Sequence, residues 1–106
     1  MNIYTEVANK VASNREEFRC RMMQLSNKEL YDNAYKIMVV ESFAEMFCSA
    51  WLEGLDFLEE PLKYFNQFDN VLEYVYLEWL STDEYFTESW DEMAEWLYNL
   101  YKYTVE

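Results

Sequence analysis

The sequence predicts a small all-α domain in which residues 1–106 form a single acidic bundle of four to five helices. The chain contains one glycine and one proline, whereas an all-β domain needs several turns built from these residues. Hydrophobic residues make up 52% of the chain, which is ample for the core of one domain of this length. Aromatic residues make up 20%, so burial can offset the entropy of ordering despite the high charge.

The first segment, from Asn2 to about Gln24, has apolar residues three and four positions apart. This spacing is typical of one face of an amphipathic helix. The polar Asn14 interrupts the apolar face, and Ser13 with Glu16 can form an internal capping box. The segment therefore forms either one helix or two short ones.

A second helix is predicted from Leu30 to about Glu53. Its start is marked by a capping box, because Ser26 and Glu29 directly precede the apolar run. Its end is marked by Gly54, which stands where a left-handed C-terminal cap is wanted. We therefore expect one continuous helix between these two signals.

The remaining helices follow from shorter signals. Pro61, within the least regular segment 55–68, suits the first turn of a short helix. Asp69 or Asn70 can cap a third substantial helix, and polar residues 81–83 interrupt its pattern and offer the cap of the last helix. The last helix is predicted from apolar residues spaced four, three, four and three apart. These residues are Phe86, Trp90, Met93, Leu97 and Leu100.

The face of the last helix opposite this apolar stripe carries a row of carboxylates: Glu84, Glu88, Asp91 and Glu95, with Glu92 beside them. On a helix the row would be about 16 Å long, with neighbours about 5 to 6 Å apart. Repulsion costs about 0.2 to 0.5 kcal/mol per pair, and no lysine follows at the compensating position. The row therefore favours a binding role over a merely solvated acidic face, which is the alternative.

Charge is unevenly distributed along the chain. Of 21 acidic residues, 16 follow Lys36, where only Lys63 and Lys102 oppose them, so residues 37–106 carry 2 − 16 = −14. The first 36 residues hold six basic and five acidic groups. Such a field acts on partners and association rates. It favours a basic protein groove built for nucleic acid as the partner, and it would repel DNA, RNA and anionic lipid.

Signals of catalysis and of metal binding are absent from the sequence. There is no histidine, and Cys20 and Cys48 lack metal-ligand spacing, so we expect buried reduced thiols. No Gly-rich phosphate loop or calcium loop is present. We expect no enzyme activity, no cofactor and no metal. Because the amino terminus lacks the features of a signal peptide and no long apolar run exists, a cytoplasmic protein with no membrane partner is expected.

Two resemblances add to these expectations. The segment Leu30–Ile37 (LYDNAYKI), with Glu41 after it and Leu77–Leu80 (LEWL) later, resembles an uncharacterised family of small helical proteins carried on mobile elements of gut bacteria. In size, acidity and helical content the chain also resembles phage and plasmid inhibitors of host defence, the anti-CRISPR and anti-restriction proteins that imitate DNA. This second resemblance implies an anti-CRISPR protein that blocks target-DNA binding by an RNA-guided nuclease such as Cas9 in a bacterial host cell.

Under this hypothesis the carboxylates take the place of DNA phosphates. The primary candidates are Glu84, Glu88, Asp91, Glu92 and Glu95, and the secondary ones are Asp56, Glu59, Glu60, Asp69, Glu73 and Glu78. The alternative hypothesis is a helical adaptor or regulatory subunit that acts through an aromatic surface, since the chain has ten tyrosines. A homodimer is compatible with both hypotheses.

Overall fold

The computed structural model describes residues 2–82, 86 and 89–105, and within these residues the chain is helical without strands. The all-α prediction is therefore confirmed. The described residues form six α-helices and two short 3-10 helices. The α-helices are α1 (Ile3–Met23), α2 (Asn27–Asp32), α3 (Ala34–Phe47), α4 (Glu59–Phe65), α5 (Val71–Leu80) and α6 (Trp90–Val105), and the 3-10 helices are η1 (Ala50–Gly54) and η2 (Asp56–Leu58).

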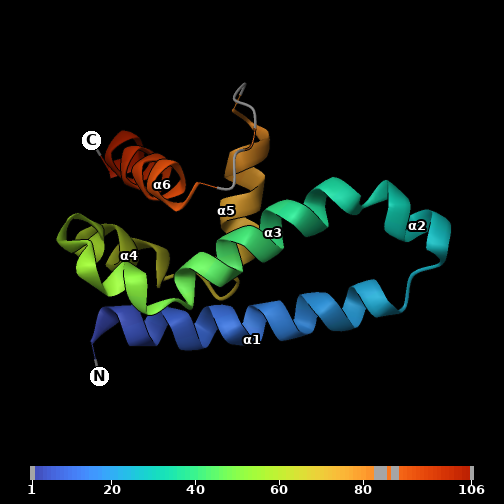
Figure 1. Ribbon diagram of the computed structural model, residues 1–106. Coiled ribbons are helices and arrows are strands. Elements are labelled where there is room, and N and C mark those ends of the chain that lie inside the picture. The colour runs from blue at the N-terminus through green and yellow to red at the C-terminus, as the bar shows by residue number, and fades with distance from the viewer. Residues whose placement is uncertain (1, 83–85, 87–88, 106) are drawn as a thin grey trace.

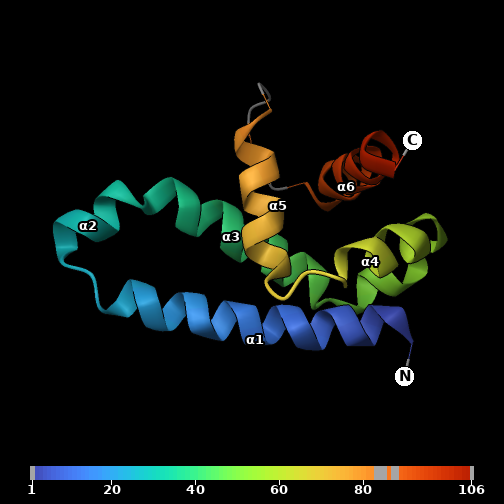
Figure 2. The same ribbon diagram turned by 180° about the vertical axis from the view of Figure 1, so that it is seen from behind.

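The helices α1 and α3 run in opposite directions as a long hairpin, with α2 at its far end (Figure 1). The helices α4 and α6 lie at the other end, near the amino terminus of α1, and α5 stands across the hairpin (Figure 2). The radius of gyration is 13.8 Å, slightly above the value of about 13 Å typical of a compact domain of this length. The hairpin end that projects beyond α5 accounts for the excess.

Helix α1 is continuous, which resolves the alternative left open by the sequence. Asn2 caps it, since its side chain accepts a hydrogen bond from the Thr5 amide at 2.9 Å. Asn14 is buried and does not interrupt the helix because its side chain is used elsewhere. Its amide nitrogen donates to the carbonyl of Asp69 at 3.1 Å, and its oxygen accepts from the amide of Val71 at 2.8 Å. Asn14 thus fixes α1 against the start of α5.

Replacing Asn14 with alanine is expected to destabilise the fold by about 1 to 3 kcal/mol, because it leaves a backbone carbonyl and a backbone amide without their partner. The measurement is urea denaturation monitored by far-UV circular dichroism. Ser13→Ala, on the exposed side of the same helix, is the matched control and should change stability by less than about 0.5 kcal/mol. Equal stability of the two variants would contradict this role of Asn14.

For the second predicted helix, the predicted start is confirmed, but the prediction of one continuous helix is wrong. The Ser26 box forms, with the Glu29 amide donating to Ser26 Oγ at 3.2 Å and the Ser26 amide donating to Glu29 Oε1 at 3.0 Å. The helix then breaks at Asn33, whose side chain donates to the Glu29 carbonyl at 2.8 Å. Side chains of this type compete with the helical backbone, so the predicted helix is divided into α2 and α3.

The predicted end of this helix at Glu53 is also wrong. Helix α3 ends at Phe47, and Ser49 donates its hydroxyl to the carbonyl of Met46 at 2.7 Å. Gly54 lies in η1 and has no positive φ, so it is not a left-handed cap. A Cβ at Gly54 would meet no atom within 4 Å. The chain turns there without needing a glycine.

The shorter helices largely follow their predicted signals. Pro61 lies in the first turn of α4, and Asn70 caps α5 by accepting from the Glu73 amide at 3.0 Å. Helix α6 begins later than predicted, at Trp90, and Phe86 lies outside it. Phe86 nevertheless packs on the core, where the centroid of its ring lies 5.3 Å from that of Trp79. Its apolar character, not a helical position, places it there.

The centre of the core is an aromatic cluster around Phe43 of α3, which is 1% exposed. The centroid of its ring lies 6.2 Å from the ring centroid of Trp79 in α5 and 5.6 Å from that of Trp96 in α6. Aromatic pairs at such distances contribute beyond the area they bury. Phe43 therefore joins the three helices that lie on different sides of the core.

Both cysteines are free, but the prediction that they are buried is wrong, because Cys20 and Cys48 are exposed. The Sγ of Cys48 donates a weak hydrogen bond to the carbonyl of Ala8 at 3.6 Å. Desolvation by neighbouring atoms raises the pKa of the Cys48 thiol. None of the helices built from the described residues combines the length and the apolar character needed to cross a membrane.

Candidate functional site

Helix α6 presents three of the predicted carboxylates to solvent. Asp91, Glu92 and Glu95 are exposed, while Met93 and Leu97 of the same helix are buried. The helix starts after Ser89, whose carbonyl accepts from the Met93 amide at 3.0 Å. Acidic residues in this first turn interact favourably with the helix dipole. Asp91 and Glu92 thus suit their positions, and they remain accessible to a partner.

The structure describes only part of the predicted row of five carboxylates. Glu84 and Glu88 lie outside the described residues. Phe86 and Ser89 are described and are not helical, and α6 begins at Trp90. The part of the row that α6 supplies is limited to Asp91, Glu92 and Glu95.

A carboxylate from another helix joins this part of the surface. Two adjacent hollows, of about 360 and about 320 Å³, share Trp96 and Asn99 as lining residues. Glu92 and Glu95 line the first hollow, and Glu78 of α5 lines the second. We call this surface the acidic hollow. Its lining residues are Glu78, Ser81, Thr82, Glu92, Glu95, Trp96, Asn99, Leu100 and Tyr103.

The acidic hollow combines negative charge with aromatic surface. Tyr103 is 89% exposed at one side of it. Trp96 packs against Trp79 of the core, and the centroids of the two rings are 5.1 Å apart. Carboxylates accept paired hydrogen bonds from a guanidinium group, and aromatic faces attract cations. The acidic hollow is therefore suited to arginine and lysine side chains of a partner.

The secondary candidates do not all belong to this surface. Glu73 forms an ion pair with Lys36 at 3.4 Å, and Glu60 forms one with Lys63 at 3.0 Å. Asp69 lies in the turn before α5, where its carbonyl accepts the hydrogen bond from Asn14. The sequence could not indicate these partners, because none except Lys63 is close in the chain.

Asp56 and Glu59 belong to a second acidic group, around Tyr4. Burial raises the pKa of the Tyr4 hydroxyl, and the negative charges of Glu59, Asp56 and Glu53 raise it further. The hydroxyl donates to the carbonyl of Leu55 at 2.9 Å. These carboxylates lie beside the amino-terminal end of α1, and the predicted acidic residues therefore occupy separate surfaces.

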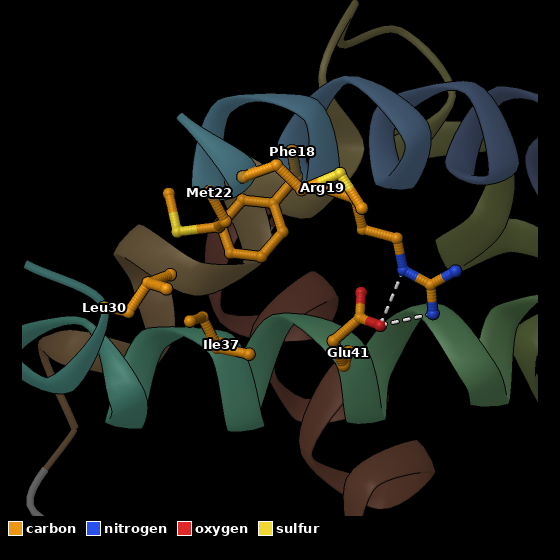
Figure 3. A pocket seen from close by; sticks show the side chains of 7 residues that line it. Phe18, Arg19, Met22, Leu30, Ile37 and Glu41 are labelled. Atoms are coloured by element: carbon orange, nitrogen blue, oxygen red, sulfur yellow. Dashed lines mark hydrogen bonds and ion pairs between the residues drawn. The ribbon is translucent and has the colours of Figure 1, made fainter. Parts of the chain in front are cut away.

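A groove of different chemistry lies at the far end of the hairpin (Figure 3). Its volume is about 400 Å³. Met22 and Phe18 extend from α1 towards Leu30 of α2 and Ile37 of α3 (Figure 3). Its lining residues are Phe18, Arg19, Met22, Met23, Leu30, Ile37 and Glu41. We call it the apolar groove, since only Arg19 and Glu41 among these residues are charged.

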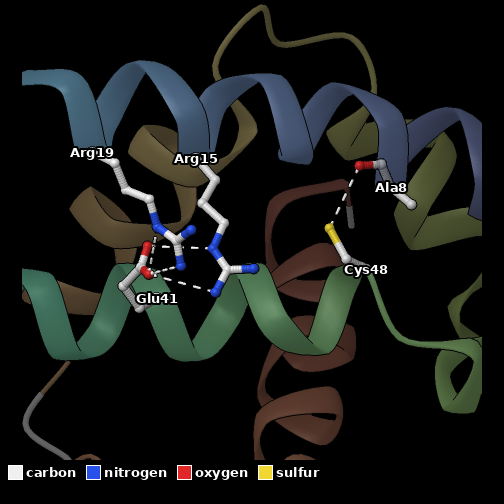
Figure 4. A network of polar contacts seen from close by, with 5 residues as sticks. All are labelled: Ala8, Arg15, Arg19, Glu41 and Cys48. Carbon is white, nitrogen blue, oxygen red and sulfur yellow. Dashed lines mark hydrogen bonds and ion pairs between the residues drawn. The ribbon is translucent and has the colours of Figure 1, made fainter.

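Glu41 closes one side of the apolar groove and is held by two arginines of α1 (Figure 4). Arg19 Nε donates to Glu41 Oε1 at 2.9 Å, and Arg15 Nε donates to Oε2 at 3.4 Å. Partial burial alone would raise the pKa of Glu41, but the hydrogen bonds from Arg19 and Arg15 outweigh it, and the pKa lies below its ordinary value of 4.5. The ionised carboxylate therefore ties α1 to α3.

Because the pKa of Glu41 is lowered on folding, its contacts stabilise the fold fully above about pH 4.5 and lose this contribution as the pH falls through the lowered pKa. Glu41→Gln should therefore lose stability relative to wild type at neutral pH, and the difference should shrink as the pH falls below about 4.5 and through the lowered pKa. Urea denaturation at a series of pH values measures it. Glu45→Gln, at an exposed position of the same helix, is the control. A difference between wild type and Glu41→Gln that is independent of pH would contradict the assignment.

Several residues of these surfaces are not identified by sequence reasoning. Trp96 and Asn99 carry no motif, and their role follows only from the position of α5 beside α6. Arg15 and Arg19 are four apart on α1, so they share a helix face. This spacing of two arginines is the feature of the sequence that indicates a shared carboxylate partner, which in the structure is Glu41. Across the described ranges, no three histidine, cysteine, aspartate or glutamate side chains are placed to hold a metal ion.

Comparison of the chain with protein-family models, curated proteins and solved structures gives no match. The resemblance of residues 30–37 and 77–80 to a family of mobile elements thus stays a prediction.

Proposed function

We propose that the protein is an inhibitor of a basic nucleic-acid-binding protein of host defence, with an RNA-guided nuclease such as Cas9 as the expected target. It would act as an anti-CRISPR protein by occupying the groove that otherwise binds DNA. The observation that carries the proposal is the acidic hollow, where carboxylates from α5 and α6 border the aromatic face of Trp96.

The sign and distribution of charge support this choice of partner. Residues 37–106 carry −14, which attracts a groove lined with arginine and lysine and accelerates association with it. Asp91 and Glu95 are exposed, and within the described residues neither forms an ion pair with a basic side chain. Their charge is available to a partner, unlike that of Glu41.

The rigidity of the surface supports the proposal as well. Helix α6 is anchored by Met93 and Leu97, which are 3% and 0% exposed. Trp96 packs on Phe43 and Trp79. A surface that is ordered before binding loses less entropy on association. The carboxylates of α6 can therefore imitate the fixed charges of a nucleic acid.

The test is a competition experiment with guide-loaded nuclease and fluorescent target DNA. Adding the protein should displace DNA in proportion to its concentration, and the effect should weaken steeply between low and high salt. Capture from host lysate at the two salt concentrations identifies the target among basic proteins. Unchanged DNA occupancy at saturating protein would rule out the mimicry mechanism for that nuclease.

The adaptor hypothesis predicts the opposite salt response, because binding through apolar side chains does not weaken when charges are screened. It also predicts that the captured proteins are not selected by positive charge. The two functional classes are thus separated by the same capture experiment.

A further inference from the structure

The projecting end of the hairpin, residues 19–38, contains no buried residue. We call this segment the hairpin tip. It holds many apolar side chains, and Met23 and Tyr31 are 83% and 82% exposed. The apolar residues of the hairpin tip are Met22, Met23, Leu25, Leu30, Tyr31, Tyr35, Ile37 and Met38. A concentration of apolar side chains on an accessible surface marks an interaction site.

Tyr35 accepts a hydrogen bond from Trp79 Nε1 at 2.8 Å, and Met22 and Ile37 pack against the core, but α2 itself has little tertiary support within one chain. Helix α2 has six residues, none of them buried, and isolated helices shorter than about 12 to 15 residues are marginal in water. Most helical stability in proteins comes from packing of an apolar face. Met22 of α1 and Leu30 of α2 line the apolar groove at this end (Figure 3). Helix α2 is therefore better stabilised when another surface covers the groove.

The charge of the hairpin tip distinguishes it from the rest of the chain. It contains four basic and two acidic residues, a net charge of 4 − 2 = +2, which leaves −13 − 2 = −15 for the other residues. Arg19 and Lys36 are paired with Glu41 and Glu73. The remaining charges are balanced, two of each sign, and all four residues are exposed: Arg21, Lys28, Glu29 and Asp32.

The balanced charges of the hairpin tip favour a second copy of the chain as the partner that binds over the apolar groove. A second copy of the chain is repelled by any strongly acidic face, but two balanced tips approach each other without net repulsion. In a two-fold symmetric contact the same patch serves both copies, so Arg21 and Lys28 of one copy can meet Glu29 and Asp32 of the other.

We propose that the hairpin tips of two copies pack against each other, with Met23 and Tyr31 of each copy covering the apolar groove of the other. The two hairpins then form a four-helix arrangement. Because α2 lies at the end of the molecule opposite to α6 (Figures 1 and 2), the acidic hollows of the dimer face away from each other. The proposal does not depend on the identity of the inhibited target.

The test is sedimentation equilibrium of the full chain at several concentrations. Wild-type protein should show a monomer–dimer equilibrium that strengthens as salt screens the negative charge of the other residues. Met23→Glu and Tyr31→Glu should each weaken dimerisation at least about 10-fold, because a charge would be buried in the interface. Both positions are exposed within one chain, so the variants should fold, and far-UV circular dichroism checks this.

The matched control is Leu77→Glu, which places the same charge on α5 at a side chain that is 55% exposed and outside the hairpin tip. It should leave the dimer unchanged. A wild-type protein that stays monomeric at all concentrations overturns the proposal. A dimer that survives Met23→Glu and Tyr31→Glu, or that dissociates with Leu77→Glu, also overturns it. If the tip variants abolish binding of a monomer to another protein, the groove's occupant is that partner and the self-contact is wrong.

Discussion

Changing Glu78, Glu92 and Glu95 of the acidic hollow together to lysine is expected to abolish DNA displacement, with affinity for the target lowered at least about 100-fold at low salt. Each change removes an attraction to a basic side chain and adds a repulsion. The formal net charge would become −13 + 6 = −7. Titration of guide-loaded nuclease with the variant, followed by fluorescence anisotropy of the target DNA, measures the loss.

The control is a triple variant with the same net charge, in which Glu16, Glu17 and Glu45 become lysine. These three residues are exposed and lie outside the acidic hollow. The control should keep its dissociation rate and lose affinity only as far as its association slows, because long-range steering depends on total charge. If both triple variants lose affinity equally, the acidic hollow is not the binding surface and the effect is one of net charge.

Replacement of Phe43 by alanine is expected to destabilise the fold by about 3 to 5 kcal/mol, a large part of the stability of a domain of this size. The ring is 1% exposed and contacts four other aromatic rings, at centroid distances from 5.6 to 6.5 Å. Its removal leaves a cavity between α3, α5 and α6 that the neighbouring rings cannot fill. Urea denaturation gives the change in the free energy of unfolding.

Phe57→Ala is the matched control, since this ring is 47% exposed and contacts Tyr98 at 5.7 Å. Its cost should be less than about 1.5 kcal/mol. Phe43→Ala should also alter the acidic hollow, because Trp96 loses a ring that packs on it. Comparable losses of stability in the two variants would contradict the central position of Phe43.

The features that could be predicted from the sequence are those decided by neighbouring residues. The Ser26 capping box, the Asn70 cap and Pro61 in a first turn all depend on hydrogen bonds or sterics within a few residues. Each of these is confirmed. The all-α class follows in the same way from helical periodicity and from the scarcity of glycine and proline.

The errors have two sources, namely local side chains that compete with the helical backbone and contacts between residues far apart in the sequence. Asn33 and Ser49 end helical segments that the apolar pattern alone would continue. Asn14 reads as an interruption in the sequence, yet it bonds to a turn more than fifty residues later. Cys20 and Cys48 follow an apolar pattern, but the surface on which they lie is not covered. Periodicity indicates which residues share a face and does not indicate what that face meets.

The candidate site was predictable in part for the same reason. Helical spacing groups Asp91 and Glu95 on one face of α6, and the structure places both there, exposed. Glu78 reaches the same surface only through the packing of α5 beside α6. Glu73 and Glu60 have equal charge in the sequence, but each is partnered by a lysine in the fold. Net charge therefore overstates the acidic surface that a partner can meet.

The positions of the tryptophans give the protein its own optical reporter. All four are paired, with Trp51 and Trp90 at 5.5 Å and Trp79 and Trp96 at 5.1 Å between ring centroids. Each pair has one member on α6 and one on another element. Rings so close couple electronically, so near-UV circular dichroism and fluorescence report whether α6 is docked. Binding of a target at α6 can thus be followed without attaching a label to the helix that the target meets.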